Sequence, residues 1–156
     1  MEKWKQGQNF KGSGSRTDYQ GTRQNQVQNE EIPNIDVQKE FKSSWISSGI
    51  DKELVDFAEK VGKYLVYKKM TTSKIRNIYS EIKRIQMNFN DEKAAFYLLK
   101  PKVAYAYGRD KSIGKFKEVF DECFKYIDDK KDNYENFCKI MEAIVAYHKA
   151  NGGKDN

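Results

Sequence analysis

From about residue 36 onward, apolar residues recur at intervals of three and four positions, the spacing of one face of an α-helix. The longest stripes are Leu54, Phe57, Ala58, Val61 and Leu65; Ile75, Ile78, Tyr79, Ile82, Ile85 and Phe89; and Phe137, Ile140, Met141, Ile144 and Val145. The alternating pattern of a half-buried strand is not found. The pattern therefore predicts an all-α compact bundle of about five or six helices.

Residues that favour helix ends divide these stripes into elements. The candidate N-caps are Asp51, Thr71 or Thr72, Asn90 or Asp91, Ser112, and Asp132 with Glu135 three residues on, as in a capping box. A short first helix is expected at about 36–45, where Val37, Phe41 and Trp45 share a face. Pro101 is expected to interrupt the helix around it, as a kink or as the first residue of a new turn.

The first 35 residues differ from the rest in composition. They are rich in Gln, Asn, Gly, Ser and Thr and nearly lack aliphatic residues. Such a segment buries too little apolar surface to offset its chain entropy, so we expect a disordered polar tail at 1–35 and a helical domain at 36–156. The sequence also has neither an apolar run of membrane-spanning length nor the apolar core of a secretory signal, which predicts a cytoplasmic protein without membrane contact.

Charge is distributed unevenly along the chain. The total is 29 Lys and Arg against 23 Asp and Glu, but residues 60–117 hold 15 of the basic residues and only 4 of the acidic ones. A concentrated basic region is typical of nucleic-acid binding. On charge alone, a lysine surface facing water explains the same numbers equally well.

One basic stretch surrounds a predicted helix start. Residues 68–77 combine four cations with three hydroxyl groups where a helix would present unpaired N–H groups and the positive end of its dipole. That combination suits phosphate. A second basic cluster surrounds Pro101 and includes Lys102 and Arg109. No base-reading pattern is present, so binding should be independent of sequence and strongly dependent on salt.

The residues needed for catalysis are scarce. His148 is the only histidine, and it lies at helical spacing from other apolar-face residues. Cys123 and Cys138 occupy apolar helix positions and are interpreted as buried thiols. The sequence lacks a phosphate-binding glycine loop and a convergent pair of carboxylates. We therefore predict no catalytic residue, no metal ligands and no cofactor.

Three segments together resemble a known family. They are residues 71–77 (TTSKIRN), residues 101–109 (PKVAYAYGR) and residues 137–147 (FCKIMEAIVAY) with the GGKD that follows at 152–155. They resemble the small helical subunit of the type III-A CRISPR effector, the Csm complex, over roughly residues 50–155. The long polar N-terminal segment departs from that family's pattern.

The resemblance implies a non-catalytic, all-helical subunit that stacks in several copies beside the backbone subunits and binds guide RNA and target RNA. Cleavage activities would belong to the backbone and large subunits. The RNA-binding residues carried over by the resemblance are Lys74, Arg76, Lys102 and Arg109. Lys68 and Lys69 join them on charge and position alone. Acidic residues of 118–135 are expected to face the basic surface of the next copy.

Two alternatives remain open at this point. A stand-alone helical nucleic-acid binder, either a DNA-binding regulator or a general RNA binder, would place base-reading residues on a recognition helix. Here the cations gather at helix ends instead. A small nuclease would need convergent carboxylates or a pair of histidines, and a cleavage assay with added metal would detect it.

Overall fold

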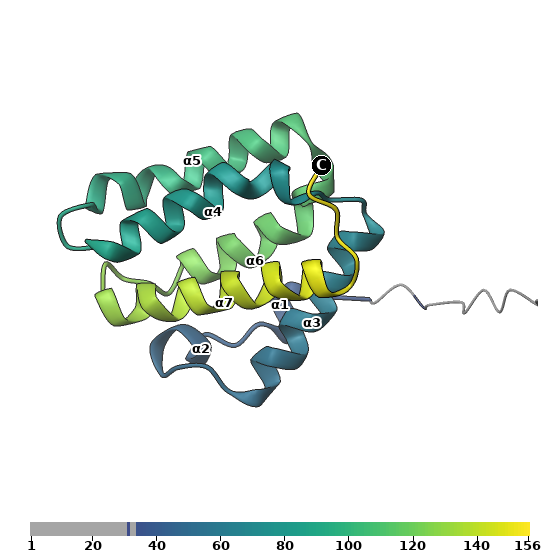
Figure 1. Cartoon of the computed structure of the whole chain (residues 1–156). Helices are drawn as coiled ribbons and strands as arrows, with labels where there is room; N and C mark the ends of the chain where they lie inside the picture. The colour runs from purple at the N-terminus through teal and green to yellow at the C-terminus, as the bar shows by residue number, and fades with distance from the viewer. Residues whose placement is uncertain (1–30, 32–33) are drawn as a thin grey trace, which may run out of the picture. The chain divides into compact units, whose positions relative to one another are not determined.

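The computed structural model describes residue 31 and residues 34–156, and the regular structure within them is helical throughout (Figure 1). The elements are α1 (Val37–Glu40), α2 (Ser44–Ser47), α3 (Lys52–Tyr67), α4 (Thr72–Met87), α5 (Lys93–Arg109), the 3₁₀ turn η1 (Lys111–Ile113), α6 (Gly114–Phe124) and α7 (Lys131–Ala150). The predicted all-α fold is confirmed, with seven α-helices in the described part where five or six were expected. The predicted tail of 1–35 lies almost wholly outside the described residues.

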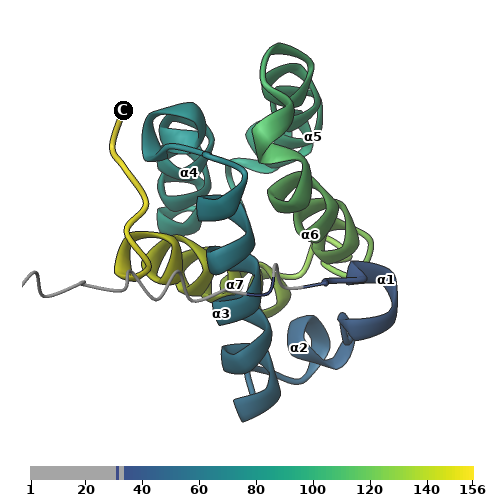
Figure 2. The ribbon, with the colours of Figure 1, turned by 90° about the vertical axis from the view of Figure 1, so that its right-hand side faces the viewer.

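Helix α7 is central to the packing of the described helices. It contacts α3 most extensively and also touches α2 and α4, while α6 packs against α1, α3 and α5. Helices α4 and α5 form an antiparallel pair joined by residues 88–92, and this pair lies on the far side of α7 from α2 (Figures 1 and 2). Among the described residues, no helix is both long and apolar enough to cross a membrane.

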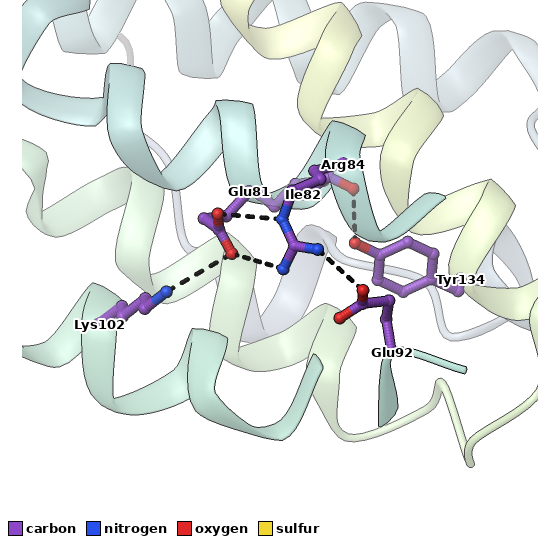
Figure 3. Close-up of polar contacts among 6 residues, drawn as sticks. All are labelled: Glu81, Ile82, Arg84, Glu92, Lys102 and Tyr134. Atoms are coloured by element: carbon purple, nitrogen blue, oxygen red, sulfur yellow. Dashed lines mark hydrogen bonds and ion pairs between the residues drawn. The ribbon is translucent and has the colours of Figure 1, made fainter. Parts of the chain in front are cut away.

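The apolar stripes form the core as the sequence predicts. Every member of the three longest stripes is buried except Tyr79 and Val145, which are half-buried. An aromatic cluster lies where α4, α5 and α7 meet: the ring of Phe89 stacks on Tyr134 with centroids 4.6 Å apart and meets Phe96 edge-on at 5.2 Å. The buried Tyr134 hydroxyl donates a 2.7 Å hydrogen bond to the carbonyl of Ile82, which joins α7 to α4 (Figure 3).

The single helix predicted at 36–45 is wrong, because the segment forms two short helices. Phe41 adopts an extended conformation (φ −69°, ψ 133°), and the segment divides into the two short helices α1 and α2. Val37, Phe41 and Trp45 are nevertheless all buried. Both Phe41 and Trp45 pack their rings against Phe57 of α3, at centroid distances of 6.4 and 5.2 Å. Contact with α3 therefore sets the local backbone more strongly than helical periodicity does.

One predicted helix cap, at Asp51, is confirmed, and another, at Asp132, is not. Asp51 caps α3 as predicted, because its Oδ1 accepts hydrogen bonds from the Leu54 amide at 2.9 Å and from Trp45 Nε1 at 2.8 Å. The capping box predicted at Asp132 is wrong. Helix α7 already begins at Lys131, and the Glu135 carboxylate instead accepts a 2.6 Å hydrogen bond from Gln86 of α4.

Pro101 does not begin a new turn, which is a second correction. Helix α5 runs without a break from Lys93 to Arg109, with the proline on its exposed face. Leu99 and Val103, on either side of Pro101, are fully buried. Their burial stabilises the helix across a residue that cannot donate its own hydrogen bond.

Helices α3 and α7 approach each other closely at Gly62. A Cβ added there would lie 2.7 Å from Tyr147 Cβ and 2.8 Å from the backbone nitrogen of His148. These distances leave no room for a side chain, so glycine is required for this crossing.

Candidate nucleic-acid interface

The α4–α5 pair carries much of the basic charge. Helix α5 contains four basic residues and no carboxylate, and α4 contains four basic residues and one carboxylate, Glu81. A groove of about 780 Å³ runs between the two helices. Its lining includes Lys74 from α4 and both Lys102 and Arg109 from α5. The structure thus brings together three of the six predicted RNA-binding residues, although they are up to 35 positions apart in sequence.

Lys74 is held in this groove by a carboxylate from beyond the end of α5. Its Nζ lies 2.8 Å from Oδ2 of Asp110 and also donates to the Ser112 hydroxyl at 3.3 Å. Asp110 accepts a further bond from the Ser112 amide at 2.9 Å. The hydrogen bond from Lys74, with those from Ser112, lowers the pKa of Asp110 to about 2. The ammonium group is therefore fixed in position and partly neutralised.

Lys102 belongs to a small ion-pair network that spans α4 and α5 (Figure 3). Its Nζ lies 3.5 Å from the carboxylate of Glu81, which also accepts two hydrogen bonds from Arg84. Arg84 in turn reaches Glu92 at 3.0 Å. The hydrogen bonds from Arg84 are the main reason that the pKa of Glu81 lies below its usual value.

Arg109 and Arg76 differ from these lysines, because neither forms an ion pair with any described residue. Arg109 is exposed at the end of the groove, with its guanidinium carbon 5.8 Å from the ring centroid of Tyr105. Arg76 is exposed on α4 but does not line the groove. It lies near Asp155, whose pKa is lowered chiefly by a hydrogen bond from Lys149 and slightly by the charge of Arg76.

Lys68 and Lys69 lie in the turn between α3 and α4, apart from the groove lining. The Lys68 ammonium is 5.6 Å from the ring centroid of Tyr64 and 5.7 Å from that of Tyr67. Lys69 adopts a left-handed conformation (φ 59°), and its carbonyl accepts a 3.3 Å hydrogen bond from Lys74 Nζ. These two cations flank the start of α4 without joining the groove.

The start of α4 is occupied by the chain's own C-terminal segment. The amides of Thr72 and Ser73 each donate a 3.0 Å hydrogen bond, to the carbonyls of Lys154 and Asp155 respectively. The expectation of free N–H groups at this helix start is therefore wrong. Thr71 is the N-cap residue, but its hydroxyl bonds to the Ser73 hydroxyl rather than to an amide.

His148 helps to hold the C-terminal segment against the start of α4. Its Nε2 makes a 2.7 Å hydrogen bond with the Met70 carbonyl just before α4, and its ring is 1% exposed. Gly153 packs on the ring so closely that a Cβ there would lie 2.3 Å from His148 Cε1. The helical spacing predicts His148 on a helix face but not its contacts with Met70 and Gly153, because no local pattern links residues 70, 148 and 153.

Other reactive side chains are inaccessible or dispersed. Cys123 and Cys138 are buried free thiols, as predicted, and burial raises the pKa of Cys138 to about 12. Within residues 34–156, no group of three or more His, Cys, Asp or Glu side chains is placed to hold a metal ion.

The fold and the groove define a small all-α protein whose distinguishing surface is a basic pair of helices. A family model described as Csm2 Type III-A matches residues 50–154, more than half of the chain, and the chain belongs to this family. It is therefore a small subunit of the type III-A CRISPR complex, as the sequence resemblance indicated. Membership of this family is consistent with a structural role. Neither a curated protein nor a solved structure matches the chain.

The residues that match the family model cover most of the described helices. It begins just before α3 and ends at Lys154, so it includes the groove and most of the segment that covers the start of α4. Helices α1 and α2 precede it.

Proposed function

We propose that this subunit binds the backbone of the guide and target RNA in the type III-A complex and has no catalytic activity of its own. The observation that carries the proposal is the α4–α5 groove, where Lys74, Lys102 and Arg109 converge from two helices. Lysine ammonium groups suit phosphate as point charges, and arginine can contact it with two parallel hydrogen bonds. In this proposal the subunit acts in the cytoplasm with the backbone and large subunits.

The six basic residues contribute unequally in this proposal. A phosphate that approaches Lys74 or Lys102 must compete with Asp110 or Glu81. Arg109 and Arg76 form no ion pair with any described residue, although the Asp155 carboxylate lies near Arg76, so they provide the stronger contacts. Lys68 and Lys69 would extend the contact past the start of α4, toward the turn that follows α3.

A salt titration of RNA binding tests this proposal. We expect Arg76→Ala with Arg109→Ala, in the reconstituted guide-loaded complex, to weaken target RNA binding and to reduce the slope of log affinity against log salt by about one unit per lost contact. Lys74→Ala with Arg76→Ala should act in the same direction. Lys39→Ala on α1 removes a highly exposed cation distant from the groove and serves as control. An unchanged affinity and slope in both double variants would remove Lys74, Arg76 and Arg109 from the RNA site.

Several copies of the subunit are proposed to stack through opposite charges. The carboxylates Glu118, Asp121 and Glu122 lie on α6, and each already pairs with a lysine of the same helix or its end. The next copy's basic helices would have to share these carboxylates, in an open-ended head-to-tail contact. Charge reversal at Glu122 and Asp129 should impair assembly, and normal assembly of that variant would contradict the proposal.

A pull-down of the tagged protein from its native cell separates the two main interpretations. Recovery with short guide RNAs and other effector subunits is expected. Recovery alone, or with mixed cellular nucleic acid, would favour a stand-alone nucleic-acid binder.

A further inference from the structure

Helix α5 carries apolar side chains on both of its faces. Phe96, Leu99 and Val103 face the core and are at most 2% exposed. On the opposite face, Leu98 is 55% and Tyr105 is 68% exposed, with the exposed Pro101 between them. A helix that turns only one face to the core normally carries polar residues on the other. The outer face of α5 therefore has the character of a binding surface.

The charges on α5 indicate what kind of partner fits. All four of its ionisable side chains other than tyrosine are basic, and none is acidic. Tyr105 has Arg109 one turn after it, and the guanidinium carbon of Arg109 lies over one side of the exposed ring, 5.8 Å from its centroid. Lys102 lies three residues before the tyrosine. The exposed ring fits a partner with flat apolar surfaces, and the basic side chains fit one with regularly spaced negative charges. Single-stranded nucleic acid has both features.

We propose that an unpaired RNA base stacks on Tyr105, while Arg109 and Lys102 contact the adjacent phosphates. This inference rests on the proposed RNA binding and adds a contact with a base to contacts that are otherwise with phosphates. The adjoining groove supplies the uncharged polar side chains of Ser73 and Asn77. Stacking tolerates any base because every base has a flat face, so this contact gives a preference for unpaired RNA without reading its sequence.

Binding of oligonucleotides to the full-length chain tests the stacking contact. The probes are a fluorescein-labelled single-stranded oligoadenylate and an abasic ribose-phosphate oligomer of the same length. Tyr105→Ala should weaken oligoadenylate binding by about 5- to 150-fold and leave the salt slope unchanged, because no phosphate contact is lost. Tyr105→Phe should bind within about twofold of the wild type, since the ring is kept. Neither variant should alter binding of the abasic oligomer.

A matched control and a second measurement distinguish base stacking from a general loss of apolar surface and from a protein interface. Met87→Ala removes an 87% exposed apolar side chain from the neighbouring helix α4 and should leave both affinities unchanged. Equal losses on both probes, or no loss on either, would overturn the stacking contact. Loss of the Tyr105→Ala subunit from the reconstituted complex, with oligoadenylate binding intact, would instead identify this face as a protein interface and also overturn it.

If the proposed RNA binding itself is wrong, the results differ from those that refute only the stacking contact. In that case the wild-type chain would bind neither probe in a salt-dependent manner, and the reconstituted complex would tolerate loss of Arg76 and Arg109. If the wild type binds both probes with a steep salt dependence and Tyr105→Ala matches it, only the stacking inference is refuted.

Discussion

Gly62 offers the sharpest test of how α3 packs on α7. In a Gly62→Ala variant the new Cβ would lie 2.7 Å from Tyr147 Cβ and 2.8 Å from two backbone atoms of Tyr147 and His148. Carbon atoms in ordinary contact are about 3.5–4.0 Å apart, so the helices must separate by about 1 Å. Because two of the three nearest atoms belong to the backbone, no change of side-chain rotamer can relieve the overlap.

The expected loss of stability combines two opposing effects. Overpacking of a tight core site costs about 1–3 kcal/mol, and the rigid backbone neighbours favour the upper end of that range. Alanine gains about 1 kcal/mol over glycine inside a helix. The net destabilisation should be about 2 kcal/mol. With a urea m-value of about 2 kcal/mol/M for a small protein, the unfolding midpoint should fall by about 1 M.

Gly108 provides the matched control. It lies within α5, and nothing is within 4 Å of the position that its Cβ would occupy. Gly108→Ala should therefore stabilise the protein by about 0.5–1 kcal/mol, through helix propensity alone. Urea denaturation followed by circular dichroism measures both variants. A Gly62→Ala midpoint equal to or above that of the wild type would refute the close packing of α3 on α7.

Two further perturbations test the surroundings of α4. Asp110→Asn should cost about 1 kcal/mol or less at pH 7, because both partners of the Lys74 pair are about one-third exposed. Since the pKa of Asp110 is depressed to about 2, this difference in urea midpoint should be full above about pH 4 and vanish as the pH falls through 2; a difference that persists there would exclude the ion pair as its cause. Removal of residues 154–156 should cost about 1–2 kcal/mol and accelerate hydrogen exchange at the Thr72 and Ser73 amides, and unchanged exchange would show that the segment does not cap α4.

The longer helices could be predicted from sequence because their signal is local. In α3 the apolar spacing and the Asp51 cap both lie within the helix and its first turn, and both are confirmed. The two-part α1–α2 segment and the uninterrupted α5 could not be predicted in the same way. Their conformations depend on burial against other helices, which overrides the local preferences of Phe41 and Pro101.

The candidate site was predictable as a set of residue types but not as a geometry. The basic clusters around Lys74 and Lys102 are visible in sequence, and the structure brings one residue of the first, Lys74, and two of the second, Lys102 and Arg109, to one groove. The partners that neutralise them are remote: Asp110 lies 36 positions from Lys74, and Glu81 lies 21 positions from Lys102. No local rule indicates such pairs, so the free positive charge of these two lysines is smaller than the sequence predicts.

The covered start of α4 changes the physical argument for RNA binding. Cations near a helix N-terminus are unfavourable by themselves, and an external anion was one way to compensate Lys74 and Arg76. The chain supplies its own partners there: the carbonyls of Lys154 and Asp155 accept hydrogen bonds from the first amides of the helix, and the carboxylate of Asp110 pairs with Lys74. An RNA phosphate is therefore not required to explain the stability of that helix end. Helix α5 is what still favours RNA: four basic side chains share this helix without any carboxylate, and its exposed Tyr105 lies next to Arg109, which forms no ion pair with a described residue.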